Sequence, residues 1–391
     1  MTVSMSHKFI WILAASAFAS TFSGRAVEPM VGVIARDLAA PVETIALLAA
    51  AFTLPYAFIQ PILGPVGDAM GKERIMKISL IVLLAALALS TVATDAATLF
   101  VLRVVAGIAA GGVIPLALAL LGDRIEMARR QVAISRFLVA VIIGQLAGSS
   151  LAGILADLVG WRGVFAVSTA MMGGALAATL VGFRHAPRGS AFDLGTAIGR
   201  YRAILANGRA RMLFLLVFVE AVAIFGLFPY VAPLLEERGA GGPTQAGLAL
   251  AGFAIGGLVY SVLIGWLMRT LGLRRMLMAA GLAAAVANLA IGFGSSWQFD
   301  AAALVLLGLG FYMLHSLFQT QVTELAPESR ASAVAIHAFS FFVGQALGVV
   351  LIGWGLRSVG LLPTMALAAL LILGVGLTAA FALTGPAQRA R

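Results

Sequence analysis

Apolar and polar positions alternate along this chain in long blocks. Apolar runs of about 20 residues or more, enough for a helix to cross a bilayer, recur between charged or glycine- and proline-rich breaks. We predict twelve membrane-spanning helices, near residues 9–34, 43–67, 75–93, 98–121, 132–157, 161–183, 211–236, 244–268, 275–294, 298–324, 332–356 and 360–384. The fold class is therefore an all-α membrane protein.

Composition supports this fold class. Of the 391 residues, 61% are hydrophobic and 11% charged, with a mean hydropathy of +1.04. A soluble domain cannot hide that much apolar surface. The first apolar run, from Phe9, continues past any signal-peptidase site, so we interpret it as a retained helix. The chain has no cysteine, which excludes disulfides and thiolate metal sites.

The net charge of +10 reflects how the chain is oriented in the membrane. With the N-terminus placed in the cytoplasm, 20 of the 26 lysines and arginines fall in cytoplasmic segments and only 4 in outer loops. This bias follows the positive-inside rule. The basic excess is therefore no sign of nucleic-acid binding, and we expect a multi-pass protein of a bacterial inner membrane with both termini in the cytoplasm.

The longest polar break, residues 184–210, divides the chain into two groups of six helices, at 1–183 and 211–391. Within this linker, four apolar residues recur at helical spacing beside arginines: Leu194, Ile198, Tyr201 and Leu205. The spacing predicts an amphipathic helix on the inner membrane face. A disordered linker is the alternative.

The two groups of helices are an internal repeat. At an offset of 200 residues, Gly144-Gln145 matches Gly344-Gln345, Pro29 matches Pro229 and Gly160 matches Gly360. Because each half has an even number of spans, the halves form parallel repeats, an architecture of transporters in which one half rocks against the other. Four Gly-x-x-x-Gly pairs, starting at Gly107, Gly144, Gly252 and Gly344, predict close helix packing, either static or permitting sliding.

A dense polar turn follows the second predicted span. It carries, in order, Gly64, Asp68, Gly71, Lys72 and Arg74. Gly71 permits a tight reversal, and Asp68 ends the helix where it can meet a cation or a helix N-terminus. With this spacing and place, the chain resembles the major facilitator superfamily. The resemblance implies two six-helix bundles and a turn that latches the halves on the inner side. The turn also serves as a simple hairpin with orienting charges.

Two further motifs resemble bacterial drug or metabolite:proton antiporters. The fourth span carries Arg103-x-x-x-Gly107-x-x-x-Gly111-Gly112, similar to the pattern of proton-coupled members. The sixth span begins with "GWRGVF", similar to bacterial exporters. Residues 148–153 read "GSSLAG", where the antiporters carry Gly-Pro.

Ionisable side chains inside the spans are candidates for proton coupling, because a charge in hydrocarbon is costly unless it is paired or hydrated. Arg25 and Glu28 lie three residues apart on one helix face. They form a self-neutralising pair, or Glu28 exchanges a proton while Arg25 modulates it or meets an anionic solute. Arg103 pairs with Glu28 across the bundle or takes part in coupling.

The second half holds Glu220 near mid-depth of its span, with no basic residue within a turn. A buried carboxylic acid that stays neutral at rest is what a proton carrier requires. The alternative is a protonated acid bonded to a neighbouring helix. His315 is a further candidate for coupling and can also be a packing residue. On these grounds we expect Glu28→Gln or Glu220→Gln to abolish proton-driven transport.

Other polar residues inside the spans are candidates to line a central cavity. They are Tyr56, Gln60, Gln145, Tyr230, Tyr260, Tyr312, Gln319, His337 and Gln345. Some of them simply bridge helices by hydrogen bonds. With 23 phenylalanines and few charges, such a cavity suits an amphipathic solute better than a sugar.

These features predict a transporter and not an enzyme. The sequence has no Gly-x-x-x-x-Gly-Lys-[Ser/Thr] loop, metal-ligand cluster or nucleophile–base signature, so we expect no cofactor or metal. The first hypothesis is a monomeric proton-coupled exporter of small amphipathic or drug-like molecules, with protons, solute and lipid as its partners. A dedicated transporter of a siderophore, sugar or organic anion is the alternative, and a non-transporting sensor or scaffold is a third.

Overall fold

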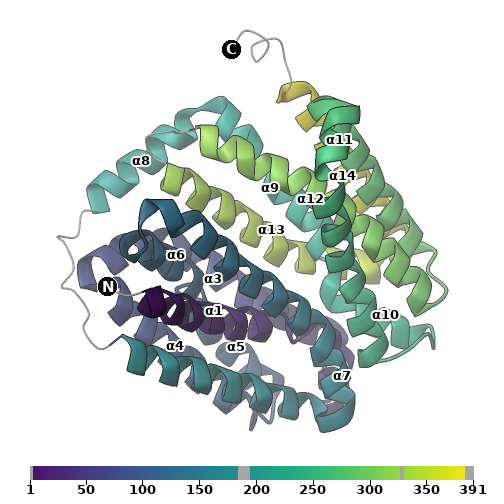
Figure 1. The fold of residues 1–391 in the computed structure, drawn as a ribbon. Helices are drawn as coiled ribbons and strands as arrows, with labels where there is room; N and C mark the ends of the chain where they lie inside the picture. Colours follow the sequence, from purple (N-terminus) through teal and green to yellow (C-terminus); the bar gives the residue numbers. More distant parts are fainter. Residues whose placement is uncertain (1–2, 184–193, 326–329, 384–391) are drawn as a thin grey trace. The chain divides into compact units, whose positions relative to one another are not determined.

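The computed structural model describes residues 3–183, 194–325 and 330–383, and the elements that it assigns there are all helices (Figure 1). The fold is therefore all-α, as the sequence predicts. The chain forms two compact units, Met1–Ile198 and Gly199–Arg391. Residues 184–193 of the predicted linker lie outside the described residues, and its second part forms the helix α8 (Leu194–Ala206).

The first unit contains seven α-helices before α8 and one short 3-10 helix. They are α1 (Val3–Arg25), η1 (Glu28–Met30), α2 (Val31–Asp37), α3 (Val42–Met70), α4 (Lys72–Ser90), α5 (Ala96–Ala110), α6 (Val113–Arg124) and α7 (Met127–Gly182). Asp95 begins α5 as its N-cap, accepting from the Thr98 backbone N–H at 2.8 Å. The bonds from the Thr98 backbone and hydroxyl hold the pKa of Asp95 below its ordinary value.

The second unit repeats this order with fewer interruptions. Its elements are α9 (Gly208–Phe225), η2 (Phe228–Tyr230), α10 (Val231–Glu237), α11 (Pro243–Gly292), α12 (Trp297–Leu325), α13 (Arg330–Val359) and α14 (Leu361–Ala382). The ends of α1, η1 and α2 map onto those of α9, η2 and α10 at the 200-residue offset found in the sequence. The backbone therefore repeats as the sequence does.

Nine stretches of the described chain are long and apolar enough to cross a membrane. Two of them, in α7 and α11, are 51 and 50 residues long, and each bends at a glycine with left-handed φ, +71° at Gly160 and +65° at Gly272. Since about 20 residues suffice for one crossing, each of the two provides a pair of spans, which raises the number from nine to eleven. The remaining predicted span, 75–93, lies largely in α4, whose first turns are charged.

Three predicted spans are interrupted in the structure. The span at 9–34 breaks after Arg25, and the span at 211–236 breaks after Phe225. Pro29 and Pro229 follow these breaks at equivalent positions, and proline cannot supply the N–H that would continue an α-helix. The span at 98–121 is also split, at Gly111-Gly112 between α5 and α6.

Glycine contacts inside each unit explain why the helices pack so closely. A Cβ at Gly107 would overlap the carbonyl oxygen of Phe52, and at the equivalent Gly308 it would overlap that of Phe253. Gly148 lies against α1 in the same way, because a Cβ there would be 2.5 Å from the Phe22 oxygen. The predicted glycine faces thus pack helices within a unit, which supports their static role.

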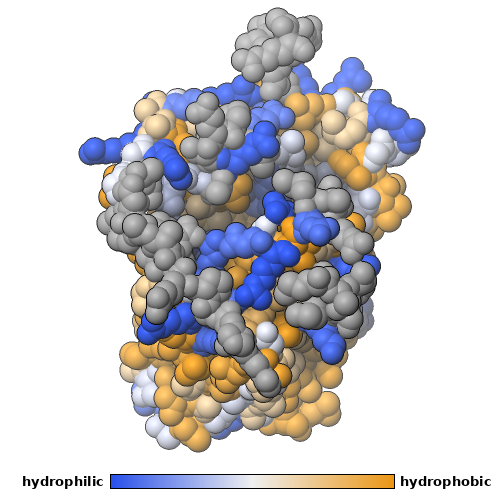
Figure 2. Space-filling model, turned by 60° about the vertical axis from the view of Figure 1, so that its left-hand side comes forward, coloured by the Kyte–Doolittle hydropathy of each residue, from blue (hydrophilic) through white to orange (hydrophobic). Residues whose placement is uncertain are grey.

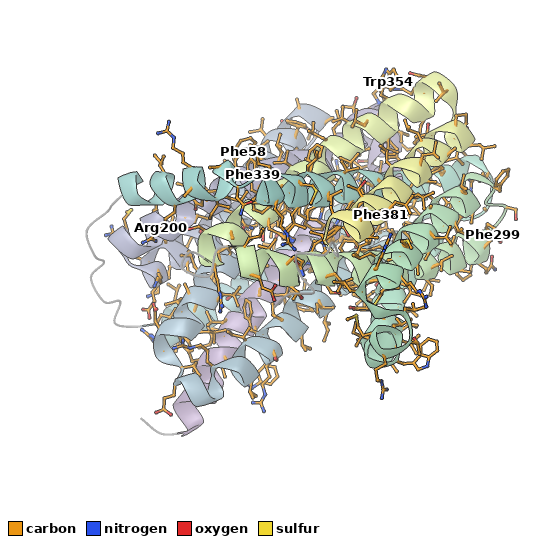
Figure 3. All side chains as sticks on the ribbon, turned by 90° about the horizontal axis from the view of Figure 1, so that it is seen from above. Phe58, Arg200, Phe299, Phe339, Trp354 and Phe381 are labelled. Atoms are coloured by element: carbon orange, nitrogen blue, oxygen red, sulfur yellow. The ribbon has the colours of Figure 1, made fainter. Side chains whose placement is uncertain are left out.

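The outer surface of the helices is rich in exposed apolar residues. Leu158 is 73% exposed, Val262 81% and Leu370 68%, which suits contact with lipid. Figure 2 shows broad hydrophobic areas of this kind around a gathering of hydrophilic side chains. Large rings are exposed as well, including Trp354 at 62% and Phe381 at 61%, both labelled in Figure 3.

Candidate functional site

In the first unit, the break between α1 and η1 holds a buried carboxylate. Glu28 is 3% exposed, and its Oε1 accepts a hydrogen bond from Arg25 Nη1 at 2.7 Å. Its Oε2 accepts a second bond from the Ser149 hydroxyl of α7 at 2.9 Å. The predicted Arg25–Glu28 pair is therefore present, and both carboxylate oxygens have donors.

Arg103 lies fully buried on α5 and forms no bond to Glu28. Its guanidinium donates instead to three backbone carbonyls: Ser23 and Gly24, each at 2.9 Å, and Leu48 at 3.3 Å. It also lies over the Phe52 ring, 4.4 Å from its centroid. The last carbonyls of a helix have no partners within that helix, so Arg103 caps α1 where it breaks.

This capping role leads to a stability prediction. Arg103→Lys keeps the charge but replaces a planar fork of donors by one ammonium, which cannot reach three carbonyls in this arrangement. We expect a loss of about 3 kcal/mol, corresponding to two charge-assisted hydrogen bonds. Thermal unfolding of the purified protein in detergent would measure it. The exposed Arg357→Lys is the matched control, and equal midpoints for the two variants would contradict the capping role.

In the second unit, Glu220 of α9 is fully buried and faces His315 of α12. Its Oε2 lies 2.8 Å from His315 Nδ1, while its Oε1 has no hydrogen-bond partner among the described residues. His337 of α13 packs edge-on against His315 with ring centroids 5.0 Å apart, and its Nε2 also lacks a partner there. Two of the predicted residues thus meet across helices, and a third joins them.

Aromatic rings surround this group. His315 stacks on Phe311 at 4.8 Å between centroids and packs against Phe341 at 4.6 Å. Phe225 contacts both phenylalanines, at 5.1 and 5.4 Å. The acid and the two imidazoles therefore lie at the edge of an apolar aromatic cluster, where little polar material screens a charge.

The internal repeat allows each of these polar residues to be compared with the residue at the equivalent position of the other unit. The offset is 200 residues for α9 and α13, and 201 residues for α5 and α12, as the matching contacts of Gly107 and Gly308 show. On this basis, the positions equivalent to Glu220, His315 and His337 in the first unit are held by Ser20, Ile114 and Phe137. Conversely, Arg25, Glu28 and Arg103 correspond to Phe225, Phe228 and Leu304. Each unit therefore holds its own polar group at sites where the other unit is mainly apolar, so packing alone does not require these charges.

The remaining cavity candidates are placed as follows. Tyr56, Tyr230, Tyr260, His337 and Gln345 are buried, Gln60, Gln145 and Tyr312 are half-buried, and Gln319 is exposed. Tyr230 donates to the Val349 carbonyl at 3.0 Å, and the Tyr260 hydroxyl lies 2.5 Å from that of Ser316. These two tyrosines bridge helices within the second unit, and their part in solute binding stays a prediction.

The polar turn after α3 reverses at Gly71, whose φ of +91° favours glycine. Lys72 pairs with Asp123 at 2.6 Å, and Glu73 pairs with Arg124, which joins α4 to the end of α6. Arg74 is exposed. The side chains of Gly64, Pro65 and Gly67–Ala69, including Asp68, lie outside the described residues. The latch between halves therefore stays a prediction. Within the first unit, the two ion pairs hold the start of α4 against the end of α6.

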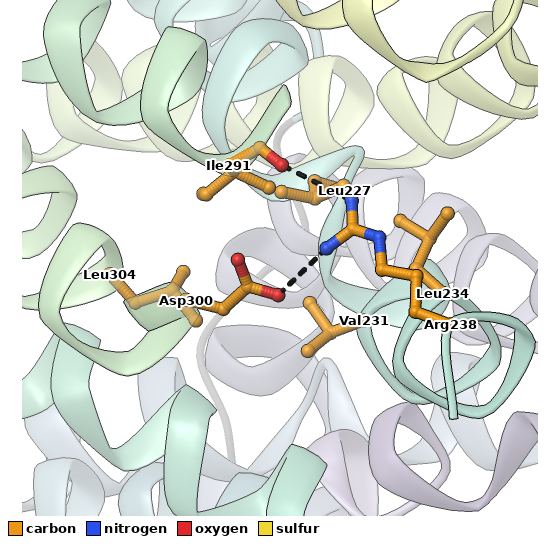
Figure 4. A pocket seen from close by; sticks show the side chains of 7 residues that line it. All are labelled: Leu227, Val231, Leu234, Arg238, Ile291, Asp300 and Leu304. Atoms are coloured by element: carbon orange, nitrogen blue, oxygen red, sulfur yellow. Dashed lines mark hydrogen bonds and ion pairs between the residues drawn. The ribbon is translucent and has the colours of Figure 1, made fainter. Parts of the chain in front are cut away.

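A small hollow near the ends of α10 and α11 holds a further buried ion pair (Figure 4). Arg238 Nη1 donates to Asp300 Oδ2 at 3.1 Å, and its Nη2 donates to the Ile291 carbonyl at 3.2 Å. Leu227, Val231, Leu234 and Leu304 complete the lining. The pair ties α10, α11 and α12 together, while Asp300 Oδ1 has no hydrogen-bond partner among the described residues.

Several of these partners were not identified from the sequence. Ser149 belongs to the "GSSLAG" segment. It directly follows Gly148, which packs against α1, and this neighbourhood was the sequence feature that could have placed Ser149 near Glu28. Asp300 and Arg238 lie 62 residues apart, and His315 lies 95 residues from Glu220, so no local spacing joins them. Within the described residues, no group of three or more His, Cys, Asp or Glu is arranged to hold a metal ion.

Comparison with known proteins agrees with this architecture. The sequence matches the family described as Major Facilitator Superfamily over residues 13–242 and 213–391. It is 24% identical over 373 residues to an uncharacterised MFS-type transporter, YwfA, of Bacillus subtilis, covering 91% of this chain and 89% of that one. Its fold is similar to those of the nucleoside transporter NupG (TM-score 0.74, 15% identity, 96% and 98% of the two chains) and a POT family transporter in complex with 5-aminolevulinic acid (TM-score 0.76, 13% identity, 94% of each).

Proposed function

Because this chain belongs to the Major Facilitator Superfamily and is a membrane transporter of that type, we propose that it is a proton-coupled secondary transporter. In this proposal it exports small amphipathic or drug-like molecules from the bacterial cytoplasm across the inner membrane by alternating access. Both termini lie in the cytoplasm, as the distribution of basic residues indicates.

The observation that carries the proposal is the Glu220–His315 pair. The 2.8 Å contact between Oε2 and Nδ1 is kept whether the proton is on the carboxyl or on the imidazole, so the pair can hold a proton in two arrangements. Glu220 is fully buried and has no lysine or arginine among its described partners. An ionised carboxylate is costly where it is buried without a cation. If the site becomes hydrated during transport, this cost falls and Glu220 can release its proton; when the site closes again, the acid takes a proton up.

Glu28 is the second candidate and differs in its surroundings. Arg25 and Ser149 already donate to its two oxygens, so both oxygens are engaged in hydrogen bonds within the unit. We therefore rank Glu220 and His315 above Glu28 as the proton carrier, and assign Arg25 and Ser149 to holding Glu28 in place.

The aromatic surroundings support an amphipathic solute. Phe225, Phe311 and Phe341 form one connected cluster beside His315, and such rings bind flat or apolar groups. The alternative of an anionic metabolite depends on Arg25 and Arg103 as receptors for the anion. Arg103 is committed to backbone carbonyls and Arg25 to Glu28, which makes this alternative less favoured.

A flux assay tests the proposal. The purified protein is reconstituted in liposomes, and a panel of radiolabelled amphipathic solutes, organic anions and sugars is offered with and without a pH gradient. We expect transport of amphipathic solutes that the gradient drives above the level of protein-free liposomes. Gradient-dependent transport confined to anions or sugars would favour the metabolite transporter. Absence of flux for every solute would favour the sensor or scaffold.

A further inference from the structure

A small hollow lies between the N-terminal parts of α1 and α7 in the first unit. It is lined by Ile10, Trp11, Ala14 and Arg136. The two helices run in the same direction, since further along both of them Thr21 of α1 donates to the Val141 carbonyl of α7 at 3.3 Å. The hollow is therefore formed by two helices that are firmly packed against each other.

Arg136 is an unusual side chain for its position. It is exposed, and no hydrogen bond, ion pair or ring contact joins it to another described residue. On α7 it lies one turn after Val132 and one turn before Val139, which are 55% and 54% exposed, so it interrupts an apolar stripe. A cation on such a stripe is stabilised by a counter-ion.

Trp11 supplies the second part of the hollow. Its indole is 70% exposed, which leaves a large apolar face with one N–H donor uncovered beside Arg136. Lys8 is exposed one turn earlier on the same helix. An exposed guanidinium, a flat apolar face and a second cation one turn away match a ligand that has an acidic group and an apolar body.

The internal repeat offers a built-in comparison. At the equivalent positions, the second unit has Arg211 in place of Trp11 and Ile336 in place of Arg136. Arg211 donates to the Leu205 carbonyl at 3.1 Å, so its charge is used within the unit. At these two equivalent positions, only the first unit combines a tryptophan with an arginine that has no partner among the described residues, so the fold does not require the combination there.

We propose that the hollow between α1 and α7 is a binding site for an amphipathic anion, with the acidic group at Arg136 and the apolar body against Trp11. The ligand has two possible sources with the same chemistry, an anionic membrane phospholipid or a soluble amphipathic acid. The site lies in the first unit and the Glu220–His315 pair in the second, and the proposal does not depend on proton coupling.

Native mass spectrometry of the full chain in uncharged detergent tests this site with three probes: phosphatidylglycerol, dodecyl phosphate and inorganic phosphate. We expect the two amphipathic anions to bind and inorganic phosphate not to compete. Arg136→Gln should weaken their binding about tenfold, as expected for the loss of one charge-assisted contact. Trp11→Leu, which keeps Arg136, should weaken it to a smaller extent.

Arg357→Gln is the matched control, because Arg357 is also exposed and lies one turn from the exposed Trp354 on α13. It should bind both probes as the unmodified protein does. Tighter binding of phosphatidylglycerol identifies a lipid site, and tighter binding of dodecyl phosphate identifies a site for a soluble acid. Equal effects of the two arginine substitutions, or equally strong binding of inorganic phosphate, would overturn the proposal.

Discussion

Glu220→Gln is expected to reduce gradient-driven transport to the level of protein-free liposomes while the protein still folds. Glutamine has nearly the same shape as glutamic acid and can keep a hydrogen bond to His315, so the 2.8 Å contact and the packing around it are retained. It cannot gain or lose the proton that the pair shares. Solute flux with and without a pH gradient, measured on equal amounts of reconstituted protein, provides the test.

Glu324→Gln is the matched control for this substitution. Glu324 is an exposed residue of α12, the helix that carries His315, and the change makes the same chemical substitution outside the buried pair. We expect it to transport as the unmodified protein does. The sequence alone predicts that Glu28→Gln also abolishes transport. The structure revises this expectation: Glu28→Gln should retain more gradient-driven flux than Glu220→Gln, because Glu28 is held by Arg25 and Ser149. Full transport by Glu220→Gln would remove that residue from the proton pathway.

Gly107→Ala is expected to destabilise the protein strongly although it adds a single methyl group. The new Cβ would overlap the carbonyl oxygen of Phe52, and a backbone atom cannot move aside as a flexible side chain can. The helices α3 and α5 would have to separate, which also disturbs the carbonyls that Arg103 caps. We expect a cost of about 3 kcal/mol or more, at the upper end for added volume in a packed core, measured as a lower unfolding midpoint in detergent.

Gly174→Ala provides the control, because a Cβ there would meet no other atom within 4 Å. Removing a glycine from a helix interior without a clash is expected to be neutral or slightly stabilising. Gly308→Ala repeats the test in the second unit, where the methyl group would overlap the Phe253 carbonyl. A Gly107→Ala protein as stable as Gly174→Ala would show that the glycines do not set the helix spacing.

Much of the fold could be predicted from the sequence because lipid restricts the choices. A chain in hydrocarbon must satisfy its backbone within helices, so apolar length identifies the spans. The repeat was visible because glycines and prolines recur where the backbone needs them, as at Gly160 and Gly360, with φ of +71° and +83°. The breaks at Arg25 and Phe225 were missed, since an apolar run hides an interruption unless the following proline is given weight.

The polar groups were harder to predict than the spans. Glu220 and His315 were both singled out as ionisable residues in apolar helices, yet their contact depends on how α9 packs on α12, which no local pattern encodes. Arg103 was expected to meet Glu28 or to take part in coupling. It donates to backbone carbonyls that the break in α1 leaves without partners, and its part in coupling stays a prediction. The charge of Arg103 in the sequence does not indicate that backbone carbonyls of α1 lack hydrogen-bond donors.

The most direct test of the account is infrared difference spectroscopy of the reconstituted protein as a transported solute binds. The central claim is that Glu220 and His315 share a proton that is released or taken up during transport. We predict a change in the carboxylic acid C=O band together with an imidazole change, both lost in Glu220→Gln. The same carboxyl band in Glu220→Gln, or a solute-induced spectrum without any carboxyl change, would contradict the claim.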